Sequence, residues 1–128
     1  MPVNLKRKSD ENLETAQWAE RKNFFHAAAS RFYYSLYQKM IYIAMRDGFN
    51  PSGIVTHKAF IDTFIRHKAG MLTLEQNAII GEIHGLRSLR NQIEYKDYWL
   101  NDQQHYLAKF KKKYDQVESV IDTLLASP

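Results

Sequence analysis

The segment from Phe24 to Arg46 constrains the fold most, because it carries two apolar stripes at helical spacing. The first stripe is Phe25, Ala28, Phe32, Leu36, Met40 and Ile43, and the second is Phe24, Ala27, Tyr34, Tyr37, Ile41 and Ala44. A helix with apolar residues on two sides is contacted by more than one neighbour. The segment is therefore predicted to be the central helix of its domain.

Capping and turn residues divide the flanking sequence into further helices. Ser9 or Asp10 is a suitable first cap, and a helix is predicted over about residues 9 to 22. Gly48 ends the central helix, and 50–53 is dense in turn-forming residues. Thr56 then caps a short helix that ends near Gly70.

Two more helices complete the chain. Thr73 and Gln76 fit a capping box, so one helix is predicted over about 73 to 96. Asn101 or Asp102 caps the last helix, whose packing stripe is predicted to be Tyr106, Phe110, Lys113, Val117, Val120 and Leu124. No stretch alternates with period two for long enough to form a strand. The predicted fold is all-α, an up-and-down four-helix bundle with an additional short helix, in one domain over residues 1–128.

Composition excludes several classes of site. The chain has no cysteine, which excludes disulfides, thiolate metal ligands and a cysteine nucleophile. Its five histidines lack the three- or four-residue helical spacing of metal ligands, so we expect neither a metal nor another cofactor. The longest apolar stretch is too short to cross a bilayer, which favours a cytoplasmic protein without a membrane partner. The formal charge of +4 weakly favours nucleic acid or an acidic partner.

Arginines beside tyrosines suggest a polar site. Arg87 and Arg90 share one edge of a predicted helix near Tyr95, and guanidinium groups bind phosphate or carboxylate through two parallel hydrogen bonds. The alternative is a surface ion pair between Arg90 and Glu94.

The central helix carries a further arginine. Arg31 has apolar neighbours in the sequence and is expected to need a carboxylate, with Glu94 or Asp97 as candidates. That contact could be structural or functional. Tyr34 and its neighbouring tyrosines either belong to the core or stack on a ligand.

The motifs together resemble a small stand-alone subgroup of bacterial HEPN-domain proteins. They are Arg31-Phe32-Tyr33-Tyr34-Ser35-Leu36-Tyr37, Asn50-Pro51, His57 with Phe60 and Phe64, and Arg90-x-x-x-Glu94-Tyr95. The resemblance covers about residues 10 to 125. It implies a helical bundle, frequent homodimerisation and often a neighbouring nucleotidyltransferase as partner, in a toxin–antitoxin or defence pair. Some relatives cleave RNA without metal, using an arginine, a polar residue and a histidine four to six positions after the arginine.

The chain departs from that ribonuclease pattern. Arg90 and Asn91 match its arginine and polar residue, but Tyr95, Lys96 and Asp97 occupy the positions where histidine is required. Tyrosine is a poor proton shuttle near neutral pH. We therefore expect a non-catalytic module that holds RNA, a nucleotide or a partner protein.

The residues expected to form this binding site are Arg31, Tyr34, Arg87, Arg90, Asn91, Glu94 and Tyr95. One alternative is a metal-independent ribonuclease in which Arg90 holds phosphate and either Tyr95 or a spatially adjacent His57 moves the proton. Another is a purely structural interaction bundle.

Overall fold

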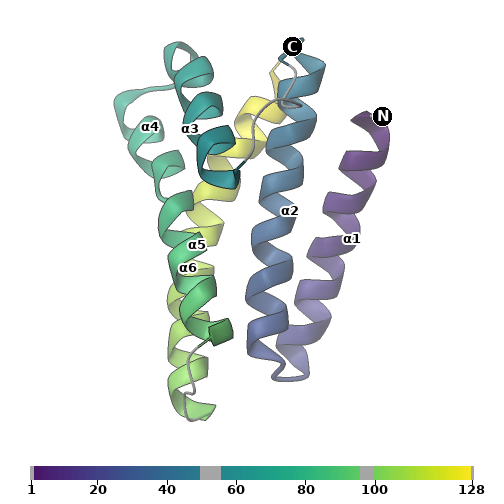
Figure 1. The fold of residues 1–128 in the computed structure, drawn as a ribbon, viewed down its shortest axis with the longest axis vertical. Coiled ribbons are helices and arrows are strands. Elements are labelled where there is room, and N and C mark those ends of the chain that lie inside the picture. The colour runs from purple at the N-terminus through teal and green to yellow at the C-terminus, as the bar shows by residue number, and fades with distance from the viewer. Residues whose placement is uncertain (1, 50–55, 96–99, 128) are drawn as a thin grey trace.

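The computed structural model describes residues 2–49, 56–95 and 100–127, and all regular structure in these ranges is helical (Figure 1). The elements are α1 (Pro2–Arg21), α2 (Phe25–Arg46), α3 (His57–Lys68), the short 3₁₀ helix η1 (Ala69–Met71), α4 (Leu74–Gly81), α5 (Ile83–Tyr95) and α6 (Leu100–Ala126). The prediction of an all-α chain is confirmed.

Four elements, α1, α2, α5 and α6, lie side by side (Figure 1). Successive members of this set run in opposite directions along the long axis, as an up-and-down arrangement requires. The short helices α3 and α4 lie at the end of the molecule that holds the C-terminus.

Helix α2 is the centre of this arrangement and contacts α1, α5 and α6. Its first apolar stripe, from Phe25 to Ile43, is buried along its whole length, as the sequence predicts. The second stripe is mostly half-buried, because only Ala44 is fully covered and Phe24 is 48% exposed. One strip of α2 therefore remains accessible between its neighbours.

Small residues bring α1 close to α2. Ala16 and Ala19 are buried at this contact, and the Ser9 hydroxyl donates to the carbonyl oxygen of Ser35 at 2.7 Å. Ser9 is thus a buried partner within α1 instead of its cap. The helix begins at Pro2, seven residues earlier than the predicted Ser9, since proline is well tolerated in the first helical turn.

The long helix predicted over 73 to 96 is two helices in the structure. The first helix ends at Glu82, whose backbone N–H donates to the carbonyl oxygen of Ile79 at 3.0 Å. This bond spans three residues, as in a 3₁₀ turn, instead of the four residues of an α-helix. Gly81, a weak helix former, directly precedes the break. The prediction of one continuous helix was wrong at this point.

The packing stripe of α6 also differs from the prediction. The buried residues are Leu107, Phe110, Tyr114, Val117, Val120, Ile121 and Leu124. Lys113 lies at the edge of this stripe and its Nζ donates to Glu82 Oε2 at 2.8 Å. Tyr106 is only partly buried against the core.

The caps predicted at Thr56, Thr73 and Gly48 are confirmed, whereas Ser9 and Asp10 lie inside α1 and do not cap it. Thr56 Oγ1 accepts from the Ala59 backbone N–H at 3.0 Å, and Thr73 and Gln76 form a capping box. Gly48 has a φ of +83°, the left-handed conformation that favours glycine after a helix. The turn at 50–53 and the side chains of Asn101 and Asp102 lie outside the described residues.

Over the described residues, no helix is long and apolar enough to cross a membrane.

An ion pair between a buried lysine and a more exposed aspartate joins the ends of α2 and α3. Lys68 Nζ donates to Asp47 Oδ2, and the Lys68 side chain is only 5% exposed. Asp47 also accepts from Arg46 Nε at 3.0 Å.

Replacing Asp47 with asparagine should lower the free energy of unfolding by about 2 kcal/mol at neutral pH, because Lys68 would keep a buried charge without a carboxylate. Burial raises the pKa of Asp47, but hydrogen bonds from Lys68 and Arg46 outweigh it and hold this pKa below its usual value. A depressed folded-state pKa stabilises the fold above the unfolded-state pKa, and the contribution is lost as the pH falls through the folded-state value.

Urea denaturation at neutral pH and below pH about 4 checks this prediction. The difference between wild type and Asp47→Asn should shrink in acid. Asp10→Asn, an exposed change on α1, serves as the control. If Asp47→Asn lowered the free energy of unfolding equally at both pH values, the ionised Asp47 carboxylate would not be the stabilising partner of Lys68.

Candidate functional site

Arg90 of α5 lies against two tyrosines of α2. Its Cζ is 5.5 Å from the ring centroid of Tyr33 and 5.2 Å from that of Tyr34. Tyr33 is fully buried, whereas Tyr34 and Arg90 are half-buried. Cation–π contacts of this kind stabilise a partly desolvated guanidinium group. Arg90 is thus fixed beside the accessible strip of α2.

His57, the first residue of α3, completes the arrangement. Its ring stacks on Tyr37 with centroids 4.0 Å apart and an interplanar angle of 17°. Its Nδ1 lies 3.2 Å from the Tyr33 hydroxyl oxygen. The Thr56 cap fixes where α3 begins and so places His57 at this point. We call Tyr33, Tyr34, Tyr37, His57, Arg87 and Arg90 the Arg–Tyr–His cluster.

Burial keeps His57, Tyr33 and Tyr37 of the cluster neutral. Burial, followed by the positive charges of Arg87 and Arg90, lowers the pKa of His57. Burial raises the pKa of Tyr33 even though both arginines oppose the shift, and it raises the pKa of Tyr37. At neutral pH the two arginines therefore carry the charge of the cluster.

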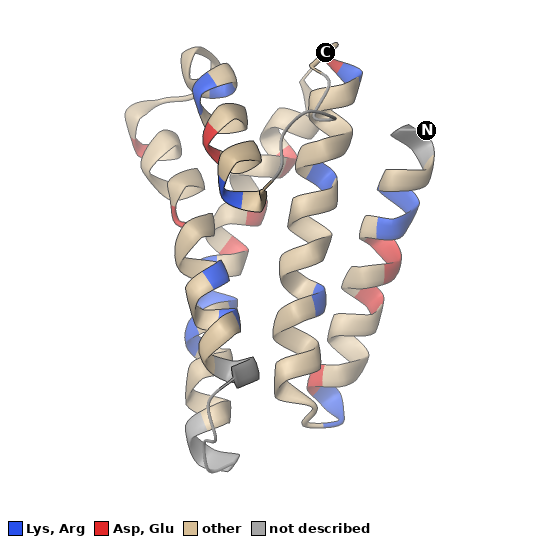
Figure 2. Ribbon diagram, in the orientation of Figure 1, with Lys and Arg blue, Asp and Glu red and all other residues tan. Residues whose placement is uncertain are grey.

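The charges around the cluster favour an anion. Figure 2 shows positive but no negative residues along α5 from Ile83 to Gln92. Guanidinium groups bind oxyanions, tyrosine rings offer stacking surfaces, and a neutral imidazole can accept a proton. These are the groups needed to hold a phosphate and the base or sugar attached to it.

The structure brings together only part of the predicted site. Tyr34, Arg87 and Arg90 belong to the cluster, and Asn91 follows Arg90 as an exposed residue of α5. Glu94 and Tyr95 end α5, but their side chains lie outside the described residues. The predicted ion pair between Arg90 and Glu94 therefore stays a prediction.

Arg31 was expected to need a carboxylate, but its described hydrogen-bond partner is a neutral side chain. It is exposed on α2, and its Nη1 donates to Asn12 Oδ1 of α1 at 3.1 Å. Apolar neighbours in the sequence do not bury it, because it points along the accessible strip of the helix. The carboxylates proposed for it, Glu94 and Asp97, lie outside the described side chains.

Sequence reasoning did not place His57 at its main contacts. Its described partners, Tyr33 and Tyr37, lie on α2, the helix that precedes α3 in the chain. The spacing of these tyrosines, four residues apart, was the available signal, since such a pair lies on one helix face.

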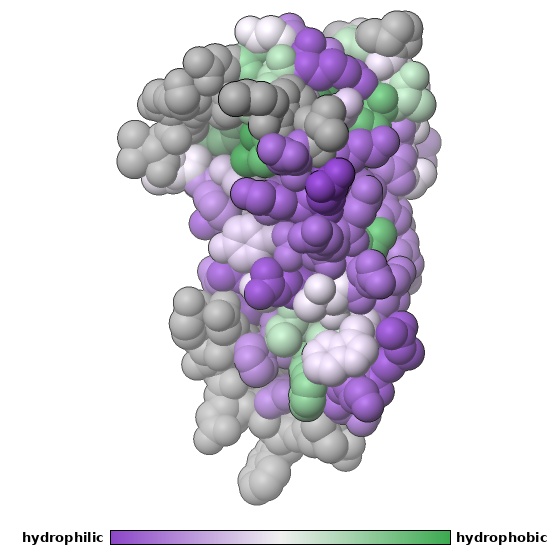
Figure 3. All heavy atoms as spheres, turned by 90° about the vertical axis from the view of Figure 1, so that its right-hand side faces the viewer, coloured by the Kyte–Doolittle hydropathy of each residue, from purple (hydrophilic) through white to green (hydrophobic). Residues whose placement is uncertain are grey.

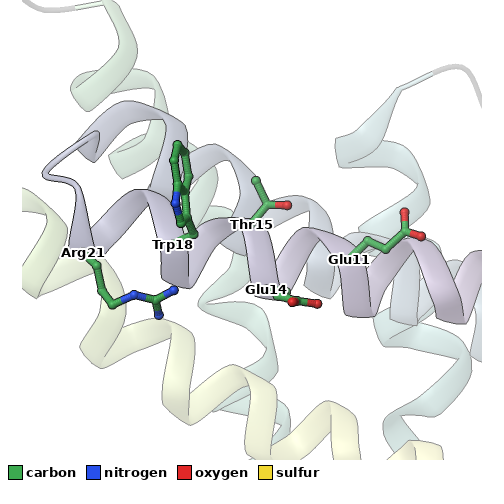
Figure 4. A pocket seen from close by; sticks show the side chains of 5 residues that line it. All are labelled: Glu11, Glu14, Thr15, Trp18 and Arg21. Carbon is green, nitrogen blue, oxygen red and sulfur yellow. The ribbon is translucent and has the colours of Figure 1, made fainter.

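A hollow lies on the outer side of α1, where Figure 4 shows Glu11, Glu14, Thr15, Trp18 and Arg21 on one helix. Trp18 is 47% exposed and packs edge-on against Phe24 with ring centroids 5.6 Å apart. The face on this side of the molecule is mostly hydrophilic (Figure 3). Both signs of charge occur along this one helix, which is typical of a solvated surface.

Among the described residues, no group of three or more His, Asp or Glu side chains is placed to hold a metal ion. Comparisons with protein-family models, with curated proteins and with solved structures find no match to this chain. Function is therefore inferred from the cluster itself.

The titration of His57 tests the geometry of the cluster. We expect a pKa below the ordinary value of about 6.5, and Arg87→Gln should raise it because one of the opposing charges is removed. NMR titration of the imidazole C–H signals in both proteins measures the shift. Arg66→Gln, an exposed change on the same helix as His57, should leave it unchanged. If the pKa of His57 were the same in Arg87→Gln and in the wild type, Arg87 would not lie close to His57 in the cluster.

Proposed function

We propose that the chain is a HEPN-like, non-catalytic binding module whose Arg–Tyr–His cluster holds the phosphate of a nucleotide or RNA. The observation that carries the proposal is the position of Arg90 against the faces of Tyr33 and Tyr34, with Arg87 on the same edge of α5. This combination supplies an anion-binding fork beside aromatic surfaces.

The pairing of other cations supports this proposal. Lys39, Lys68, Lys111 and Lys113 each have a carboxylate within ion-pair distance. Arg87 is half-buried and makes no ion pair with any described side chain. A partly desolvated charge without a carboxylate is costly, and an anionic ligand would offset that cost.

The wider setting of the proposal rests on the family resemblance. We propose a homodimer and a nucleotidyltransferase-type protein as partner, within a toxin–antitoxin or defence pair. The arginine and tyrosine motifs named above support this setting. Co-purification with the product of an adjacent reading frame would test it.

Loss of the two arginines should weaken ligand binding strongly. The double variant Arg87→Gln/Arg90→Gln should weaken binding of a short labelled RNA by at least about a hundredfold, because two charge-assisted phosphate contacts are lost. Fluorescence anisotropy at low salt measures the affinity. The matched control is Arg66→Gln with Lys112→Gln, which removes the same charge from exposed sites.

The thermal unfolding of the double variant separates binding from structure. A folded variant that binds RNA as the wild type does would reject the phosphate site. In that case the contact of Arg90 with Tyr33 and Tyr34 would serve only to hold α5 on α2.

A second function, metal-independent RNA cleavage, is favoured by the position of His57. With the Nδ1–H of His57 donating to the Tyr33 hydroxyl oxygen, Nε2 could accept the proton of a ribose 2′-hydroxyl. The 2′-oxygen would then attack phosphorus, and the departing 5′-oxygen would take a proton from water. The product would be a 2′,3′-cyclic phosphate, with the arginines stabilising the charge on phosphorus.

Incubation of the protein with RNA in the presence of a chelator decides between binding and cleavage. The proposed function predicts no cleavage even at high protein excess. If cleavage is seen, His57→Gln should lower its rate by about 10²-fold or more, because the proton acceptor is removed. Cleavage that persists in His57→Gln would exclude His57 as the base.

A further inference from the structure

A polar hollow lies between α1 and α2, apart from the Arg–Tyr–His cluster. Its lining residues are Lys8, Glu11, Asn12, Thr15, Arg31 and Gln38. We call it the α1–α2 hollow. It contains two cations, one carboxylate and three neutral hydrogen-bonding side chains, so its formal charge is positive.

Hydrogen bonds orient the arginine of this hollow. Asn12 Nδ2 donates to Gln38 Oε1 at 2.7 Å, which leaves Asn12 Oδ1 to accept from Arg31 Nη1 at 3.1 Å. The α1–α2 contact thus directs a guanidinium group that makes no ion pair with any described side chain. A guanidinium group held by one nitrogen keeps its other N–H donors for an oxyanion.

Tyr34 connects the hollow to the cluster. It lies three residues after Arg31 and four before Gln38, so these three residues share one face of α2. Tyr34 is half-buried, and Arg90 of α5 lies 5.2 Å from its ring centroid. Helices α1 and α5 lie on opposite sides of α2 (Figure 1). Arg31 and Arg90 therefore flank the same tyrosine along the accessible strip of α2.

We propose that Lys8 and Arg31 form a second phosphate-binding subsite, so that a single nucleic-acid strand crosses α2 from the cluster to the α1–α2 hollow. This inference rests on the proposed function, because the first phosphate is held by Arg87 and Arg90. Tyr34 lies between the two subsites and offers a ring on which a base can stack. Arg31 lies three residues before Tyr34, a helix rise of about 4.5 Å, so a strand that stacks on Tyr34 passes close to Arg31.

Glu11 limits the affinity of the second subsite. Its carboxylate lines the same hollow as Lys8 and Arg31 and repels phosphate. A mononucleotide held at the cluster does not reach the hollow, so only longer ligands respond to these three residues. Ligand length therefore separates the two subsites.

The experiment compares hexauridylate with uridine 5′-monophosphate. Anisotropy of the labelled hexamer and calorimetry of the monophosphate are measured for the wild type, Arg31→Gln, Lys8→Gln and Glu11→Gln. Lys112→Gln, an exposed change on α6, is the matched charge control. Circular dichroism melting verifies that each variant is folded.

Arg31→Gln should weaken binding of the hexamer about tenfold and lower the slope of log affinity against log salt concentration by about 0.7. Lys8→Gln should act in the same direction, and Glu11→Gln should strengthen hexamer binding a few-fold. Affinity for the monophosphate should stay unchanged in all three variants.

Each other outcome is decisive. If Arg31→Gln and Lys8→Gln bind the hexamer with wild-type affinity and the monophosphate is still bound, the second subsite is overturned and the proposed function stands. Equal losses for the hexamer and the monophosphate in Arg31→Gln also overturn it, since the two subsites would not be separate. A wild type that binds neither ligand rejects the proposed function and this inference together.

Discussion

The packing of α2 against three other helices is the constraint on which the rest of the structure depends. Contacts with α1, α5 and α6 bury its first apolar stripe and Tyr33. Three helices cannot enclose a fourth completely, so one strip of α2 stays partly accessible. Arg31, Tyr34 and Gln38 lie on this strip, and Tyr34 meets Arg90 beside it. The position of the polar site thus follows from how the core is built.

Local signals predicted the elements of the fold well, because caps and glycine turns act within a few residues. The Thr56 and Thr73 caps and the left-handed Gly48 are examples. The residues of α6 that are buried were predicted less well from the sequence. Tyr114 lies in the core with its hydroxyl donating to Glu118 at 2.7 Å, whereas Lys113 lies at the edge of the stripe and donates to Glu82. Such choices depend on partners in three dimensions, which periodicity alone does not specify.

The arginines of the candidate site could be singled out from the sequence, whereas His57 entered only as an alternative proton acceptor, without its contacts. Arg87, Arg90 and Tyr34 stand out as cations and a ring at helical spacing, a local pattern. His57 meets Tyr33 across 24 residues of sequence, and its position depends on how α3 packs on α2. The same limitation explains Arg31: a helix that is apolar overall still has an accessible strip, and only the packed structure shows which residues occupy it.

The charges that would bind a phosphate also control the histidine. Arg87 and Arg90 help to lower the pKa of His57, so the imidazole is neutral in the absence of a ligand. In the proposed complex an anion would offset these charges, and the pKa of His57 would rise. Because proton uptake and anion binding would then favour each other, ligand affinity should increase as the pH falls toward the folded-state pKa of His57. The arginines would thus keep His57 neutral in the free protein, and its basicity would increase when a phosphate binds.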